Sequence, residues 1–137
     1  MNNKKLGSKF EHEICRRLAN KGYWVHFLSP DIRGAQPFDI IAARDGITVA
    51  IDCKTCAADS ISISRLEQNQ ITAFEKWMRC GNRFPVIVVE HSSGIKCIEY
   101  VDLKAQKKVW IGGKTYERIQ DSELDFSVSF DDYFDGI

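Results

Sequence analysis

Residues 37–54 read PFDIIAARDGITVAIDCK, and this stretch decides the fold of the chain. Two apolar runs flank the dipeptide Asp45-Gly46, which is a strong short-range signal for a two-residue β-hairpin turn. Each run also carries an acid, Asp39 in the first and Asp52 in the second. A carboxylate on an apolar strand is unfavourable unless it is paired with a cation or bound to a metal. The hairpin therefore predicts a site as well as a fold.

Side chains alternate between the two faces of the strand predicted over 47–55. Asp52 and Lys54 then point to the same face, and Asp39 lies close to them on the neighbouring strand. Two converging carboxylates repel each other unless a cation lies between them, and the candidates are Lys54 alone or a divalent metal beside Lys54. The alternative is a partly exposed strand end, where Asp52 and Lys54 form a surface ion pair and Asp39 is solvated.

Two more polar residues fall within predicted apolar faces. In the helix predicted over 6–20, Glu11 lies inside the apolar stripe, where it could bind a metal. It could instead fold back onto the backbone of Ser8 in a capping box. A second helix, predicted over 64–80, has Gln70 in the middle of its apolar face. A buried glutamine needs hydrogen-bond partners, which could be backbone at a strand end or the acidic residues.

The other segments complete a mixed α/β domain with the element order αβββαβ followed by further β-structure. We expect one domain over 1–137, with a core at about 5–103, an accessory hairpin at 104–120 and an acidic C-terminal segment at 121–137. The remaining elements are predicted to be a strand at 23–29, a loop at 30–37, a capping box of Ser64 and Glu67 that opens the second helix, an interior strand at 84–91, a strand at 94–103 and a hairpin at 108–116.

The formal net charge of zero hides an uneven distribution. Six of the 19 acidic residues fall within 121–137, which leaves the preceding 120 residues with a net charge of +6. A moderately basic body suits a polyanionic partner, and the acidic end could shield that surface or keep the protein soluble. No run of apolar residues is long enough to span a membrane, and the start of the chain has no signal-peptide pattern, so we expect a cytoplasmic protein.

Two short motifs are interpreted as structural. The five cysteines are an odd, scattered set typical of reduced thiols. A zinc site would need a second pair beside the CxxC at 53–56, and a redox site would need that motif to open a helix. The sequence GGKT at 112–115 lacks the earlier glycine of a phosphate-binding loop, since Lys108 occupies that position.

The residues assembled above resemble the PD-(D/E)XK nuclease superfamily and, within it, the Holliday junction resolvase-like branch. The resemblance covers about residues 5–91, and one residue separates Pro37 from Asp39, which these families allow. It implies a restriction-endonuclease-like fold, with an αβββαβ core, a mixed central sheet flanked by helices, and extra C-terminal β-structure. The matching motifs, in family order, are GSKFEHEICRRLANKGYWV with Glu11, PFDIIAARDG with Asp39, AIDCKT with Asp52 and Lys54, and QITAFEKWMRCG with Gln70.

The resemblance also implies roles for these residues. Asp39, Asp52 and Glu11 would hold Mg²⁺ or Mn²⁺, Lys54 would orient or deprotonate the attacking water and steady the phosphate, and Gln70 would support the site. Phosphodiester hydrolysis needs a Lewis acid and a nucleophilic hydroxide, and carboxylate oxygens suit Mg²⁺. The lysine would supply a point charge where negative charge develops.

DNA contacts are predicted at basic and polar residues on the two helices and in the loop before Asp39. Such contacts to phosphates position DNA without reading its sequence, and each of these residues could equally be an ordinary solvated side chain. The candidates are Lys4, Lys5, Lys9, Arg16, Arg17, Ser29, Arg33 and Arg65.

Three functional hypotheses follow. The first is a metal-dependent endonuclease acting on branched DNA as a homodimer, because symmetric cutting of two strands needs two sites. The second is another repair, replication or restriction-type nuclease of the same fold. The third is a non-catalytic nucleic-acid-binding module, although binding alone gives no reason to cluster acids.

Overall fold

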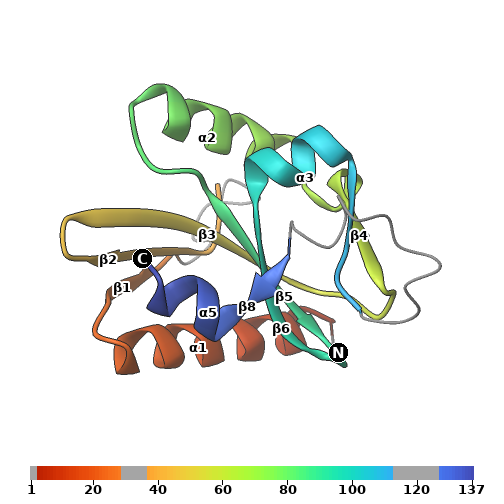
Figure 1. The fold of residues 1–137 in the computed structure, drawn as a ribbon, viewed down its shortest axis with the longest axis horizontal. Helices are drawn as coiled ribbons and strands as arrows, with labels where there is room; N and C mark the ends of the chain where they lie inside the picture. The colour runs from red at the N-terminus through yellow and green to blue at the C-terminus, as the bar shows by residue number, and fades with distance from the viewer. Residues whose placement is uncertain (1–2, 29–36, 113–126) are drawn as a thin grey trace.

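The structure is a computed structural model that describes residues 3–28, 37–112 and 127–137. Within these residues a mixed sheet of six strands has the order β1-β2-β3-β5-β6-β8 (Figure 1). Neighbouring strands pair antiparallel except β3 and β5, which run parallel. The strands are β1 (Trp24–Phe27), β2 (Ile40–Arg44), β3 (Ile47–Thr55), β5 (Val86–His91), β6 (Gly94–Glu99) and β8 (Val128–Ser129). The mixed α/β fold predicted from the sequence is confirmed.

Helices cover both faces of this sheet (Figure 1). On one face pack α1 (Asn3–Asn20) and α5 (Phe130–Asp135), and on the other pack α2 (Gln68–Arg79) and α3 (Tyr100–Gln106). A separate pair of short strands, β4 (Ser60–Ser62) and β7 (Lys108–Trp110), forms a two-stranded sheet. Because β3 and β5 are buried on both faces, they read as nearly continuous apolar runs.

The hairpin between β2 and β3 forms as predicted. Asp45 and Gly46 both have positive φ, 52° and 81°, as a type I′ turn requires. The strands pair in the register that a two-residue turn imposes, with Ile40 opposite Ile51.

The predicted capping box of Ser64 and Glu67 is wrong, and so is the alternative that Glu11 caps its helix at Ser8. Helix α1 begins at Asn3, so Glu11 lies more than two turns inside it and cannot cap its start. Ser64 lies in a short 3-10 helix, η1 (Ile63–Arg65), and α2 begins only after Glu67. Leu66 is buried in the second core with an extended backbone (ψ 135°), and this separates η1 from α2.

The strand predicted over 94–103 is wrong in its second half, because β6 ends at Glu99 and α3 follows. Tyr100 and Leu103, three residues apart, are both buried against the second core, which is a helical spacing. The hairpin predicted over 108–116 is also different: its first arm is β7, which pairs with β4. Its second arm and most of the loop predicted over 30–37 lie outside the described residues.

The C-terminal ten residues are part of the fold. Phe130 and Phe134 of α5 are buried in the core beneath α1. On the outer side of the same helix, Nζ of Lys21 lies 2.9 Å from Oδ1 of Asp131 and 2.8 Å from Oδ1 of Asp135. None of the described helices is both long enough and apolar enough to cross a membrane.

Candidate active site

The open end of the β2–β3 hairpin brings Asp39 and Asp52 together. The last paired residues of the two strands are Ile40 and Ile51, and Asp39 and Asp52 adjoin them in sequence. The backbone N–H of Asp39 donates to the carbonyl of Ile51 (3.0 Å), and the N–H of Cys53 donates to Oδ2 of Asp39 (2.8 Å). The side chains are 6% and 0% exposed, so the alternative of solvated acids at a strand end is wrong.

Lys54 and Gln70 enclose Asp52 from two sides. Nε2 of Gln70 donates to Oδ1 of Asp52 (2.8 Å), and Nζ of Lys54 lies 3.1 Å from Oδ2. Nζ of Lys54 also donates to Oε1 of Gln70 (3.3 Å), and the same oxygen accepts from the N–H of Glu67 (3.0 Å). Both partners considered for Gln70, backbone and acid, are therefore present. This glutamine ties the start of α2 to β3.

Glu11 brings a third carboxyl group to the cluster from α1. Asp39 lies within hydrogen-bonding reach of both Glu11 and Asp52. Burial, and then the charge of Asp39, raises the pKa of Glu11 to about 7 and that of Asp52 well above its usual value. Burial also raises the pKa of Asp39. The cluster can hold its full negative charge only with a compensating cation.

The donor set fits a hydrated divalent cation. Oδ2 of Asp52 is buried and has no aligned hydrogen-bond donor, although the ammonium of Lys54 is near. Among the described residues, no three His, Cys, Asp or Glu side chains are placed to enclose a metal by themselves. Mg²⁺ usually takes one or two carboxylates and keeps several waters. Asp39 and Asp52, with Glu11 beside them, match that requirement.

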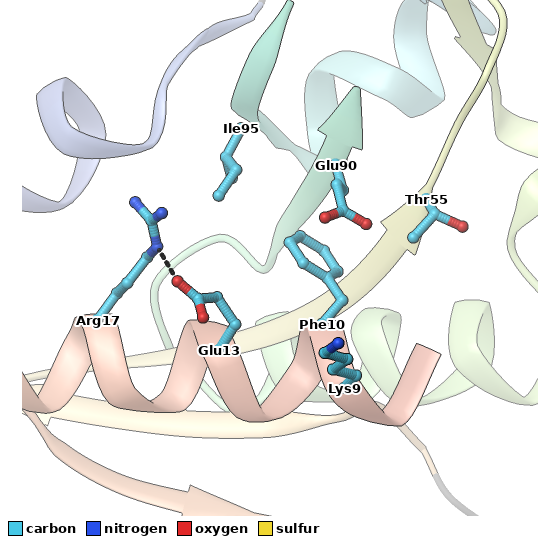
Figure 2. Close-up of a pocket in the computed structure, with 7 residues that line it drawn as sticks. All are labelled: Lys9, Phe10, Glu13, Arg17, Thr55, Glu90 and Ile95. Carbon is cyan, nitrogen blue, oxygen red and sulfur yellow. Dashed lines mark hydrogen bonds and ion pairs between the residues drawn. The ribbon is translucent and has the colours of Figure 1, made fainter. Parts of the chain in front are cut away.

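A pocket of about 460 Å³ lies on the α1 side of the sheet (Figure 2). Several of its lining residues are neighbours in sequence of residues in the carboxylate cluster. Lys9 and Phe10 directly precede Glu11, and Thr55 directly follows Lys54. Both signs of charge line the pocket, and Figure 2 shows the hydrogen bond between Glu13 and Arg17. The lining residues are Lys9, Phe10, Glu13, Arg17, Thr55, Glu90 and Ile95.

The predicted DNA contacts with described side chains are Lys9, Arg16, Arg17 and Arg65. Lys9 lines the pocket, whereas Arg16 and Arg17 are exposed and share the carboxylate of Glu13. Nη2 of Arg65 donates to the carbonyl of Thr55 (2.8 Å), which holds this arginine at the end of β3. Ser29 and Arg33 lie outside the described residues, as do the side chains of Lys4 and Lys5.

One contributor to the site and one residue of the pocket have no motif and were missed. The N–H of Cys53 binds Asp39, and Glu90 lines the pocket. A signal for the first existed, because a two-residue turn at Asp45-Gly46 fixes which residues stand opposite each other. No comparable signal exists for Glu90, which reaches the pocket only through the pairing of β5 with β3.

Comparison with known proteins points to one family. Residues 2–125 match the family described as archaeal Holliday junction resolvase (Hjc). No curated protein matches the chain. Among solved structures, a match is Hjc of Archaeoglobus fulgidus, a Holliday junction resolvase from an archaeal hyperthermophile, with a TM-score of 0.56 and 15% sequence identity. That match covers 68% of this chain and 76% of the other, and it shows a shared fold.

Proposed function

The chain belongs to the archaeal Holliday junction resolvase family of nucleases, which act on branched DNA, and we propose that Glu11, Asp39, Asp52 and Lys54 form its active site. The observation that carries this assignment is the meeting of three buried or half-buried carboxyl groups and one lysine at the end of the β2–β3 hairpin. A non-catalytic binding module would have no use for this arrangement, because clustered acids repel the phosphates of DNA.

Asp39 and Asp52 would hold a divalent metal, Mg²⁺ or Mn²⁺, with Glu11 as the third carboxylate. The ion would supply Lewis acidity at the phosphoryl group and offset the charge of the acids. Lys54 would lie close to a scissile phosphate bound at this metal, because its ammonium is 3.1 Å from Oδ2 of Asp52. It would orient or deprotonate the attacking water and steady the developing charge. Gln70 is a positioning residue, since it touches Asp52 and is buried.

The basic side chains around the cluster would contact the DNA backbone. Lys9 and Arg17 lie at the pocket on α1, and Arg65 is fixed at the end of β3 by Thr55. Contacts of this kind follow the path of the phosphates and not the base sequence, which suits an enzyme that recognises a branched shape. We also expect Ser29 and Arg33 to contribute from the segment before Asp39.

Two active sites would be needed to cut a junction symmetrically. A two-fold homodimer supplies them in one complex. We therefore propose that two copies of the chain bind one junction, and light scattering of the free protein and of the complex measures this.

Cleavage of a four-way DNA junction tests the assignment. Wild-type protein should nick the junction when Mg²⁺ or Mn²⁺ is present and not in EDTA. Asp52→Asn and Lys54→Ala should each lower the single-turnover rate by about 10²-fold or more, because each removes a charge that acts on the reacting phosphate. Asp131→Asn is the matched control: it also neutralises an aspartate that pairs with a lysine, but an exposed one on α5.

The proposal would be contradicted in either of two ways. The first is a wild-type protein that cuts no branched, single-stranded or linear DNA with either metal. The second is an Asp52→Asn variant that cuts as fast as Asp131→Asn.

A further inference from the structure

Helix α1 presents a histidine to solvent directly after Glu11. His12 is exposed, yet its ring packs against that of Phe27 on β1, with ring centroids 5.0 Å apart and planes at 40°. Phe27 itself is partly buried against the core beneath α1. The contact between the two rings therefore turns the imidazole toward β1.

Two separate contacts place this imidazole beside the carboxylate cluster. Glu11, the neighbour of His12 on α1, lies within hydrogen-bonding reach of Asp39. Leu28, the neighbour of Phe27, donates its N–H to the carbonyl of Asp39 (2.8 Å). The chain neighbours of both rings thus touch Asp39. It follows that His12 borders the cluster on its β1 side.

His12 is also the middle member of a row of exposed hydrogen-bond donors. Lys9, His12 and Arg16 are spaced three and four residues apart, so they lie along one side of α1, and all three are exposed. Arg16 shares the carboxylate of Glu13, but a guanidinium has more N–H donors than that bond uses. The row is about 10 Å long at about 1.5 Å per residue, which is the rise of about three nucleotides of one DNA strand.

We propose that the imidazole of His12 donates a hydrogen bond to a phosphate of the cut DNA strand, next to the phosphate that is hydrolysed. This inference rests on the proposed function, in which the hydrolysed phosphate lies at Asp39 and Asp52. The next phosphate along the strand then reaches the edge of the cluster. Of the three described residues that mark its β1 side, His12, Phe27 and Leu28, only the histidine has a side chain that can bind an anion. An imidazole carries an N–H in both of its charge states, so the contact does not require one particular protonation state.

The rival explanation is that His12 only packs against Phe27. A phenylalanine would make this packing equally well, because no ring N–H takes part in it. An exposed ring also gains little from the contact, since much of its surface stays in water after folding. Packing and phosphate binding therefore predict different results for His12→Phe.

Affinity for a four-way junction separates the two explanations. Wild-type protein, His12→Phe and His26→Phe are titrated with the junction in EDTA at one salt concentration. His12→Phe should weaken binding by roughly 10- to 150-fold, the range for one hydrogen bond to a charged group. Its cleavage rate at saturating enzyme should stay near wild type, because a phosphate beside the reacting one keeps its charge throughout the reaction.

His26→Phe is the matched control and should bind the junction as wild type does. His26 is also an exposed histidine that stacks on an aromatic ring of β1, in this case Trp24. It lies on the opposite face of the strand from Phe27, because side chains alternate.

A neutral phosphate analogue identifies the partner of His12. The position cut by wild type is mapped, and junctions are made with an uncharged methylphosphonate at the phosphate before or after it. On one of these two junctions wild type and His12→Phe should bind equally, because the contact is already lost. A methylphosphonate in the middle of an arm should leave the difference between the two proteins intact. A loss of affinity through altered packing would instead persist on every junction.

Three results would overturn the contact. They are an unchanged junction affinity of His12→Phe, an equal loss in His26→Phe, and a difference between wild type and His12→Phe that persists in full on both flanking methylphosphonate junctions. Failure of the proposed function gives another result: a wild-type protein that neither cuts the junction nor binds it in preference to linear duplex overturns both proposals. A wild-type protein that cuts the junction while His12→Phe keeps full affinity overturns only the contact of His12.

Discussion

Gln70 contributes both to the stability of α2 and to the geometry of the site. Its Oε1 accepts from the N–H of Glu67, which caps the helix, and its Nε2 donates to Asp52. The helical period predicted that this side chain would be buried, because it falls on the apolar face. The period could not identify its partners, since Asp52 belongs to a strand 18 residues earlier. Which partner a buried polar group finds depends on tertiary packing.

Replacement of Gln70 by Ala should separate stability from catalysis. We expect a loss of about 1–3 kcal/mol, because a helix cap is removed and a buried oxygen of Asp52 loses its donor. The single-turnover rate of junction cleavage should fall by about 10²-fold as Asp52 shifts, with little change in junction affinity, because the buried side chain does not face the DNA. Urea unfolding and cleavage at saturating enzyme measure the two effects.

Two variants on the same helix sharpen this test. Gln68→Ala removes an exposed side chain that donates to Thr72 within α2, and it should leave both rate and stability near wild type. Gln70→Glu keeps the acceptor for the cap but opposes a carboxylate to Asp52, so it should lose activity. Wild-type cleavage by Gln70→Ala would contradict the positioning role.

The acids themselves were readable from the sequence because the turn between them is local. Asp45-Gly46 fixes the register of β2 and β3, and Asp39 and Asp52 adjoin the last pair of that register, Ile40 and Ile51. Glu11 was identified by the helical period, but its approach to Asp39 depends on how α1 packs. The N–H of Cys53 was missed, although the same turn indicates that Cys53 lies near Asp39.

At the scale of elements, prediction succeeded where the signal was short-range. The β2–β3 hairpin and the interior strand β5 have strong local patterns, and both form. The pairing of β4 with β7 has no local signal, because the partners are far apart in sequence. The start of α3 is also set at long range: the N–H of Tyr100 donates to the carbonyl of Pro85, and its hydroxyl donates to Glu75.

The amino-acid composition gave the least indication of the role of helix α5. The acidic character of 121–137 suggested a segment that shields the basic surface or keeps the protein soluble, but Phe134 is fully buried and packs edge-on against Tyr23, with ring centroids 5.7 Å apart. The hydroxyl of Tyr23 donates to the carbonyl of Phe134 (2.6 Å), and the guanidinium of Arg44 donates to the same carbonyl and to that of Ile137. The acids mark only the outer side of this helix.

Phe134→Ala should therefore destabilise the whole chain. Removing a large buried aromatic ring costs about 3–5 kcal/mol, through lost burial and the cavity left behind. Asp135→Asn is the control on the same helix: it removes a surface ion pair with Lys21 and should change stability by less than about 1 kcal/mol. Urea unfolding of both variants measures the difference. Equal midpoints would show that α5 contributes no more than its surface charges.

At the scale of the whole molecule, two acids of the C-terminal helix lie at one end of α1. Asp131 and Asp135 are held by Lys21, just beyond the C-terminal end of α1. Lys9 lies about 16 Å away from that end along the helix axis, at about 1.5 Å per residue. We therefore expect Asp131 and Asp135 not to oppose DNA at the N-terminal half of α1, where Lys9 and Glu11 lie. We propose that the chain works as one domain, since its C-terminal helix closes on its first one.

Without metal, the stability of the whole chain should fall as pH rises, and a bound metal should oppose this fall. The pKa of Glu11 is raised from 4.5 to about 7 in the folded protein, and the pKa values of Asp39 and Asp52 are raised as well. Between pH 4.5 and about 7, the native state holds a proton on Glu11 that the unfolded state has released. The contribution of Glu11 is then fully present below pH 4.5 and is lost as pH rises through about 7. Without metal, Tm should fall from pH 5 to pH 8.

Mg²⁺ should restore that loss, because an ion that binds only the native state stabilises it, and fewer protons compete for the carboxylates at pH 8 than at pH 5. We expect Mg²⁺ to raise Tm strongly at pH 8 and weakly at pH 5, with EDTA as the reference at each pH. Asp52→Asn removes one of the repelling charges, so it should reduce the fall of Tm with pH in EDTA and also most of the rise with Mg²⁺. The comparison isolates the cluster from every other titrating group, which both proteins share. Two outcomes would show that the ion binds elsewhere and not at the acids of the hairpin. One is equal stabilisation of wild type and Asp52→Asn by Mg²⁺, and the other is equal stabilisation of wild type at pH 5 and pH 8.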